Sequence, residues 1–167
     1  DMAAQLAQTR RSRLVSWNGT VGNAQGTTLS QTTNTYAGVQ MRPRKAMRGG
    51  AFVITGIWFG GNTTGTLDLE LTSTNPDFTP QTIELTTSAN RFVKTTLETA
   101  ITLPLYVSGI NDLYYNFKYD PTGLRFFQNT KKQCCGGANP AWNNHLIAGG
   151  FTTTDFNDYN EYLGGSD

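Results

Sequence analysis

Residues 51–72 read AFVITGIWFGGNTTGTLDLELT, and this stretch decides the fold. Apolar and polar side chains alternate with a period of two on both sides of the Gly60–Gly65 run, as β-strands require. That run is rich in glycine and asparagine, which tolerate positive φ, and it predicts the turn of a β-hairpin. In the first strand we expect one face to carry Phe52, Ile54 and Trp58, and the other Val53, Thr55 and Ile57.

The same alternation continues to residue 127 and predicts more short strands. We expect them at Gln81–Thr86, Arg91–Leu97, Ala100–Val107, Leu113–Tyr119 and Leu124–Phe127. Helical periodicity is scarce, while aromatic residues, which favour pleated surfaces, make up 11% of the chain. The spacing predicts an all-β fold, an antiparallel β-sandwich of jelly-roll type. Its buried core is expected to include Phe52, Ile54, Leu69, Ile83, Leu103, Leu105, Tyr115 and Phe117.

Length and composition predict one domain with extensions at both ends. A chain of 167 residues can bury one sizeable core. We expect a basic, Gly/Thr-rich N-terminal arm over residues 1–48, a sandwich core over 49–130, and an irregular C-terminal extension over 131–167. The extension is expected to pack on the sandwich or on a neighbouring subunit. No apolar run approaches the roughly 20 residues of a membrane helix, so we expect no membrane partner.

Charge is distributed unevenly along the chain. Residues 1–50 carry a net charge of +6, and residues 51–167 carry −5. The basic residues of the first part are candidate contacts with subunits or partners: Arg10, Arg11, Arg13, Arg42, Arg44, Lys45 and Arg48. Phosphate binding is the alternative, but no recognition helix, RNP-like strand or zinc module accompanies the charge, so we do not expect nucleic acid as a partner.

Chemistry-bearing residues are few. Adjacent Cys134 and Cys135 bridge each other only in a strained ring, and zinc sites favour cysteines two to four residues apart. We therefore expect reduced thiols and no zinc, although His145 and Asp155 could complete a set of four ligands. No nucleophile elbow, phosphate loop or dinucleotide fingerprint is found. We expect no cofactor and no enzymatic activity.

Two further groups of residues suggest sites with simpler explanations. The segment Asp155-Phe156-Asn157-Asp158-Tyr159-Asn160-Glu161 is rich in oxygen ligands, as a calcium loop is, but it lacks the central glycine of an EF-hand. We expect it to dock instead through Phe156, Tyr159 and Tyr162. The pair Asp68 and Glu70 shares a strand face, which the wet side of a sheet explains.

Some aromatic residues are candidates for stacking on sugar rings. Trp17, Tyr114 and Trp142 lie outside the strongest inward-facing sets. The run Ser108-Gly109-Ile110-Asn111-Asp112-Leu113-Tyr114-Tyr115-Asn116-Phe117 resembles the late hairpin of galactose-binding-like carbohydrate modules, with Asn111 where those modules have histidine. The resemblance implies a jelly roll and, as an alternative function, a carbohydrate-binding module of a secreted, cell-surface or virion-borne protein.

A second resemblance covers roughly the last 80 residues. Its motifs are Phe92, Thr102-Leu103-Pro104-Leu105, the stretch Tyr115-x-Phe117-x-Tyr119-Asp120-Pro121-Thr122-Gly123-Leu124, Cys134-Cys135-Gly136 and Gly149-Gly150-Phe151. Together they resemble β-sandwich virion proteins of tailed bacteriophages that infect Bacteroidota, the crAss-like group among them. This resemblance implies a head, decoration, fibre or tail protein without catalysis. The leading expectation is a homo-oligomeric structural protein of a virion, in contact with other virion proteins.

Overall fold

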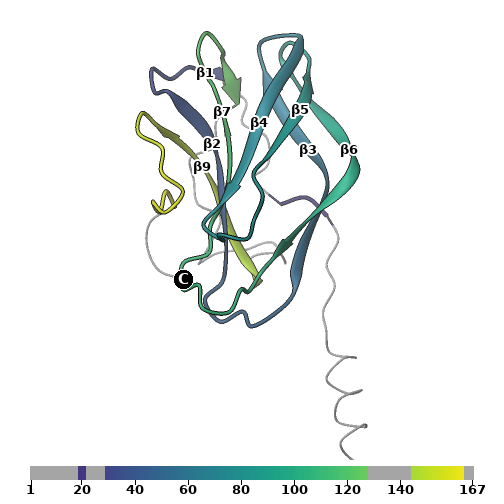
Figure 1. Cartoon of the computed structure of the whole chain (residues 1–167). Helices are drawn as coiled ribbons and strands as arrows, with labels where there is room; N and C mark the ends of the chain where they lie inside the picture. The colour runs from purple at the N-terminus through teal and green to yellow at the C-terminus, as the bar shows by residue number, and fades with distance from the viewer. Residues whose placement is uncertain (1–18, 22–28, 128–143, 164–167) are drawn as a thin grey trace, which may run out of the picture.

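The computed structural model describes residues 19–21, 29–127 and 144–163, and these residues form two antiparallel β-sheets that lie face to face (Figure 1). One sheet has four strands in the order β1-β8-β3-β6, and the other has five in the order β5-β4-β7-β2-β9. Their bounds are β1 Leu29–Ser30, β2 Tyr36–Pro43, β3 Ala51–Gly61, β4 Gly65–Ser73, β5 Gln81–Thr87, β6 Arg91–Pro104, β7 Tyr115–Tyr119, β8 Phe126–Phe127 and β9 Leu146–Thr153. The predicted all-β sandwich is confirmed.

The strand pairs follow a regular rule. The first strand pairs with the eighth, the second with the seventh, the third with the sixth and the fourth with the fifth. This is the pairing of one long hairpin with its turn between β4 and β5. The hairpin then curls so that β8 also pairs with β3 and β7 with β4. Strand β9 is not part of this hairpin. It is the edge strand of the five-stranded sheet, and it pairs with β2.

The core lies between the two sheets and confirms the inward-facing set. Ile54, Leu69, Ile83, Leu103, Leu105 and Tyr115 are buried, and Phe52 and Phe117 are half-buried against them. The hydroxyl of Tyr115 donates a 2.6 Å hydrogen bond to the Pro104 carbonyl, which lies on the opposite sheet. Burial raises the pKa of Tyr115 to about 12. The two sheets are therefore joined by a polar contact across the core.

The predicted facing of Trp58 is wrong, because the pairing of β3 with β6 is irregular. Ile54 pairs with Ile101, but Gly56 pairs with Thr96, so the residues between Thr96 and Ile101 bulge out of β6. The shift reverses the alternation. Beyond it, Ile57 and Phe59 pack against the core, while Trp58 is 50% exposed on the outer face. A bulge next to a glycine changes the phase of a strand without changing its hydropathy pattern.

The predicted domain boundaries also need correction. Residues 36–43, assigned to the N-terminal arm, form β2, which lies between β7 and β9. Residues 146–153, assigned to the irregular extension, form β9. Gly38 fits β2 because a Cβ atom there would lie 1.9 Å from the Phe117 carbonyl oxygen. A deletion of residues 1–48 would therefore remove β2, a strand with a pairing partner on each side.

Candidate interaction surfaces

The outer face of the five-stranded sheet is covered by the residues that follow β9. Residues 154–163, called here the C-terminal strap, turn back after Thr153 (yellow in Figure 1) and lie on the outward-facing side chains of β2, β7 and β4. Outward-facing polar side chains are consequently buried, since Gln40 and Asn116 are 0% exposed and Thr72 is 5% exposed. A polar layer thus lies between the sheet and the strap.

Most of these polar side chains bind the main chain of the strap. The Gln40 amide nitrogen donates to the Asn160 carbonyl at 2.9 Å, and the Gln40 amide oxygen accepts from the Tyr162 N–H at 2.9 Å. Gln40 also donates to the Asn116 side-chain oxygen at 2.9 Å. Asn116 in turn donates to the Asp158 carboxylate at 3.2 Å, and the Thr72 hydroxyl donates to the same carboxylate. The contacts define the position of the strap closely, because buried polar groups need partners.

One ion pair fixes the end of the strap. The Arg42 side chain is 4% exposed, and its Nη2 lies 3.2 Å from Oε1 of Glu161, whose side chain is 31% exposed. Within the described part of the chain, the Nε and Nη2 atoms of Arg42 make no hydrogen bond. A buried guanidinium needs a counter-charge, since an unpaired charge in the interior is strongly destabilising. Arg42 therefore depends on the carboxylate that the strap brings to it.

An aromatic cluster holds the other half of the strap. Phe151 of β9 stacks on Tyr162 at 4.5 Å between ring centroids, and Phe156 stacks on Tyr162 at 5.9 Å. The Lys118 ammonium lies 4.0 Å from the centroid of the Phe156 ring and 3.7 Å from a Glu70 carboxylate oxygen. The docking predicted for Phe156 and Tyr162 is thus confirmed. For Tyr159 it is wrong, because that side chain is 71% exposed.

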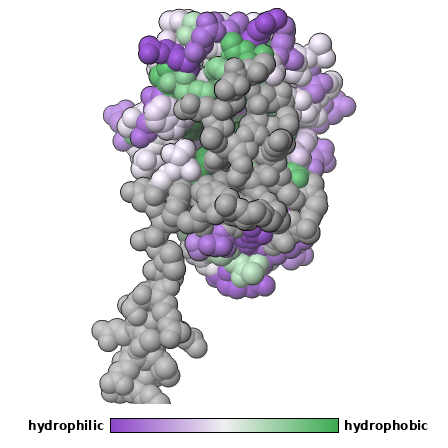
Figure 2. Space-filling model, turned by 180° about the vertical axis from the view of Figure 1, so that it is seen from behind, coloured by the Kyte–Doolittle hydropathy of each residue, from purple (hydrophilic) through white to green (hydrophobic). Residues whose placement is uncertain are grey.

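The outer face of the four-stranded sheet carries exposed apolar side chains among polar ones. Val53 is 51% exposed and Trp58 is 50% exposed. Beside Trp58, the rings of Phe92 and Phe127 stack at 4.9 Å across Gly60, where an added Cβ would meet both rings. We call Trp58, Phe92 and Phe127 the apolar outer patch. In the view from behind, apolar residues gather towards one end of the molecule among hydrophilic ones (Figure 2).

The basic residues singled out in the sequence do not form one surface. Arg10, Arg11 and Arg13 lie outside the described residues. Arg42 is buried and pairs with Glu161, so it is not part of an exposed basic surface. Lys45 is exposed and Arg44 half-buried, and both have contacts within the chain. Arg48 is exposed, donates to the Lys45 and Met47 carbonyls, and lies 5.7 Å from the Tyr106 ring centroid.

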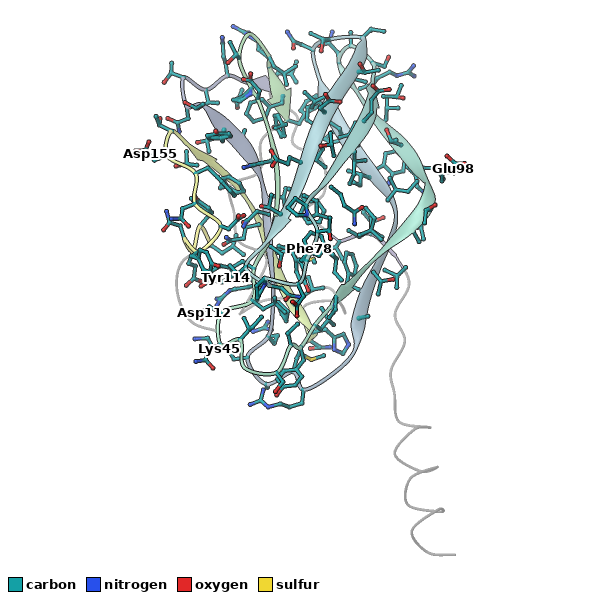
Figure 3. All side chains as sticks on the ribbon, viewed as in Figure 1. Lys45, Phe78, Glu98, Asp112, Tyr114 and Asp155 are labelled. Carbon is teal, nitrogen blue, oxygen red and sulfur yellow. The ribbon has the colours of Figure 1, made fainter. Side chains whose placement is uncertain are left out.

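The three predicted sugar-stacking residues do not form an exposed aromatic surface in the described part of the chain. Trp17 and Trp142 lie outside the described residues. Tyr114 is 5% exposed, so it has no open ring face for a sugar, and the interpretation is wrong. Its N–H donates to the Thr74 hydroxyl at 2.9 Å, and burial raises the pKa of its phenol. Figure 3 shows Tyr114 close to Asp112, whose charge adds to that rise.

The described residues also limit the metal sites considered above. Among residues 19–21, 29–127 and 144–163, no three His, Cys, Asp or Glu side chains are placed to hold a metal ion. In the calcium-like segment, Asp158 and Glu161 are used by Thr72, Asn116 and Arg42. Cys134 and Cys135 lie outside the described residues. In the described part of the chain, no helix has the length and apolar character needed to cross a membrane.

Gln40 and Asn116 hold the strap, and neither is singled out by the sequence analysis. A signal was available, because Gln40 and Arg42 alternate with Val39, Met41 and Pro43 in a strand-like pattern.

Comparisons with protein-family models, curated proteins and solved structures find no match to this chain. The functional argument therefore rests on its own geometry.

Proposed function

We propose that this protein is a non-enzymatic structural subunit that works through repeated contacts between copies, as a component of a bacteriophage virion. The observation that carries the proposal is the apolar outer patch. The Trp58 side chain, half exposed on the sheet face next to a stacked aromatic pair, gives a surface that gains free energy when a partner covers it. The proposed occupant is a second copy of the chain, since most soluble oligomers are homo-oligomers.

The strand pairing supports the jelly-roll part of the proposal. Eight strands paired as one long, curled hairpin, with four in each sheet before β9 is added, are the arrangement expected of a jelly roll. Capsid subunits use this architecture, and lectin domains use it as well. The fold alone does not choose between these functions, so the surface must decide.

Light scattering coupled to gel filtration at moderate salt tests the proposal. We expect the wild-type chain to form an oligomer, and Trp58→Ser to shift it towards the monomer. The control is Tyr159→Ser, which also removes an exposed aromatic ring but lies on the strap, away from the patch. A wild-type chain that stays monomeric up to about 100 times the concentration needed for detection would count against a self-assembling subunit.

The alternative function is that of a carbohydrate-binding module, and exposed Trp58 is the observation that favours it. Its ring stands on an open sheet face beside its cross-strand partner Lys94, where a sugar ring could stack. A glycan array probed with the wild-type chain and with Trp58→Ser distinguishes the two functions. Binding to a glycan that is lost in Trp58→Ser, by a chain that stays monomeric, would support the module and contradict the assembly subunit.

A further inference from the structure

The C-terminal part of the chain is an addition to a set of eight strands that is already paired. Strands β1 to β8 pair with one another, whereas β9 has β2 as its partner. Residues 144–163, which comprise β9 and the strap, are called here the C-terminal element. They bind the rest of the molecule along one strand edge and one sheet face, and Leu146 and Ala148 of β9 also enter the core. Their contact surface therefore resembles that of a docked ligand.

The surface that receives this element is specific. The β2 edge pairs with β9 over its whole length, from Tyr36 opposite Thr153 to Pro43 opposite Leu146. Next to the edge, buried Gln40 and Asn116 bind the strap main chain. Buried Arg42 forms an ion pair with the Glu161 carboxylate. Strand addition supplies affinity, and the side-chain contacts select the sequence that binds.

The connection between β8 and β9 is long enough to reach another molecule. Residues 128–143 join Phe127 to the C-terminal element, and at about 3.4 Å per residue they can span up to roughly 55 Å. This length exceeds the diameter of about 30 Å expected for a small domain. The connection therefore permits the element to dock on its own molecule or on a neighbouring one.

We propose that the C-terminal element is exchanged between copies, so that Glu161 of one chain pairs with Arg42 of the next. This inference deepens the proposed function and rests on it, because it names the contact through which copies are linked. Exchange keeps every contact of the closed chain, since each copy supplies the same element and the same receiving surface. Whether the element docks on its own chain or on a neighbour then depends on two effective concentrations, that of the chain's own element and that of the elements of neighbouring copies. A growing assembly makes the second concentration high.

Reversing the ion pair gives a direct test in the full-length chain. The variants Arg42→Glu and Glu161→Arg each place like charges together in the closed chain, so each should bind its own element weakly. In a mixture, exchange restores opposite charges at both receiving surfaces of a pair. We expect native mass spectrometry to show a one-to-one heterodimer, and its melting temperature to exceed that of either variant by about 5 °C or more.

The control is the double variant Arg42→Glu/Glu161→Arg, which restores the pair within one chain and should melt above both single variants. A mixture that melts as the sum of its two components, with no heterodimer, would overturn the exchange. Should Arg42→Glu not fold, the Glu161→Arg chain is titrated with a synthetic peptide of residues 144–163. A rise in melting temperature that the same peptide carrying Glu161→Arg does not produce supports the exchange, and no rise overturns it.

The outcomes separate this inference from the proposed function. If the wild-type chain oligomerises and the charge-reversed variants form no heterodimer, the proposed assembly function stands and the exchange is rejected. If the wild-type chain stays monomeric and the mixture forms the heterodimer, the receiving surface for the C-terminal element stands and self-assembly is rejected as the function.

Discussion

The two outer faces of the sandwich differ in a way that their sequences do not suggest. On the five-stranded sheet, outward-facing Gln40 and Asn116 are polar and fully buried. On the four-stranded sheet, outward-facing Val53 and Trp58 are apolar and half exposed. At these four positions the usual relation between hydropathy and burial is reversed. The reason is a third layer, because the C-terminal strap covers one face of the sandwich.

The comparison teaches that alternation predicts the direction of a side chain and not its exposure. Gln40, Asn116 and Arg42 point away from the core, and the strap then buries them with hydrogen bonds and an ion pair. An apolar residue in the same positions would leave the strap main chain without partners, which is costly in a buried site. Polar residues on a covered face therefore specify how a segment docks, whereas apolar residues on an open face favour association.

The largest expected effect comes from removing the cover. A chain that ends after Thr153 loses Phe156, Tyr162 and Leu163 from the face of the five-stranded sheet and leaves Arg42 without its counter-charge. Each apolar side chain buried there contributes about 1.5–3 kcal/mol, so we expect a loss of roughly 5 kcal/mol in the free energy of unfolding. Urea denaturation followed by tryptophan fluorescence measures it.

The control for this truncation is a chain that ends after Leu163, which keeps the whole strap. If the chain ending after Thr153 is as stable as that control, the strap is not a structural cover. The contrast between the two outer faces would then have no energetic basis.

A substitution in the shared interior calibrates both faces. Leu103 is 0% exposed and packs between the two sheets, so Leu103→Ala should lower the free energy of unfolding by roughly 2–5 kcal/mol. The loss should be equal in the full-length chain and in the chain that ends after Thr153, because the strap lies on the far side of the five-stranded sheet. Unequal losses, measured by the same denaturation, would show that strap and core are coupled.

Much of the sandwich was predictable because residues 51–127 alternate so clearly. Strands were expected at Gln81–Thr86 and Leu113–Tyr119, and β5 and β7 lie there. Two separate strands were expected at Arg91–Leu97 and Ala100–Val107, but the chain keeps pairing through the bulge and forms a single β6. The position of a bulge depends on cross-strand pairing, which the sequence of one strand does not contain.

The strands at the two ends of the fold were missed for a physical reason. Strand β2 contains Gly38 and Pro43, and β9 contains the pair Gly149-Gly150, and these residue types are depleted in strands. Gly38 is needed because β7 approaches too closely for a side chain. The requirements of neighbouring strands thus outweigh the intrinsic preferences of these residues. Because β2 could not be predicted, the contacts of Gln40 and Arg42 on it could not be predicted either.

Alkaline pH should weaken the interior that both faces share. Burial raises the pKa of Tyr115 from its ordinary value of 10.0 to about 12, and burial also raises the pKa of Tyr119. A raised pKa in the folded state means that the stabilisation is fully present below pH 10 and is lost as the pH rises towards 12. We expect Tyr115 to account for roughly 2–3 kcal/mol of this loss.

Denaturation measured between pH 9 and pH 12 checks the alkaline effect. Tyr115→Phe should be less stable than the wild type at pH 9, since it loses the hydrogen bond to the Pro104 carbonyl, worth about 1 kcal/mol. Its stability should then fall less steeply with pH, the remaining slope coming from other tyrosines such as Tyr119. An unchanged slope would mean that Tyr115 ionises as freely in the folded chain as in the unfolded one.

The smallest effect on stability is expected on the open face. Trp58 is half exposed and lies opposite Lys94 at the surface, so Trp58→Ser should change the free energy of unfolding of the monomer by about 1 kcal/mol or less. The same substitution should strongly weaken association, because a partner would bury the whole ring and large aromatic side chains dominate interface energies. Denaturation at low protein concentration gives the first quantity, and sedimentation velocity over a range of concentrations gives the second. A large loss of monomer stability with unchanged association would place Trp58 in the fold itself and remove the distinction between the covered face and the open one.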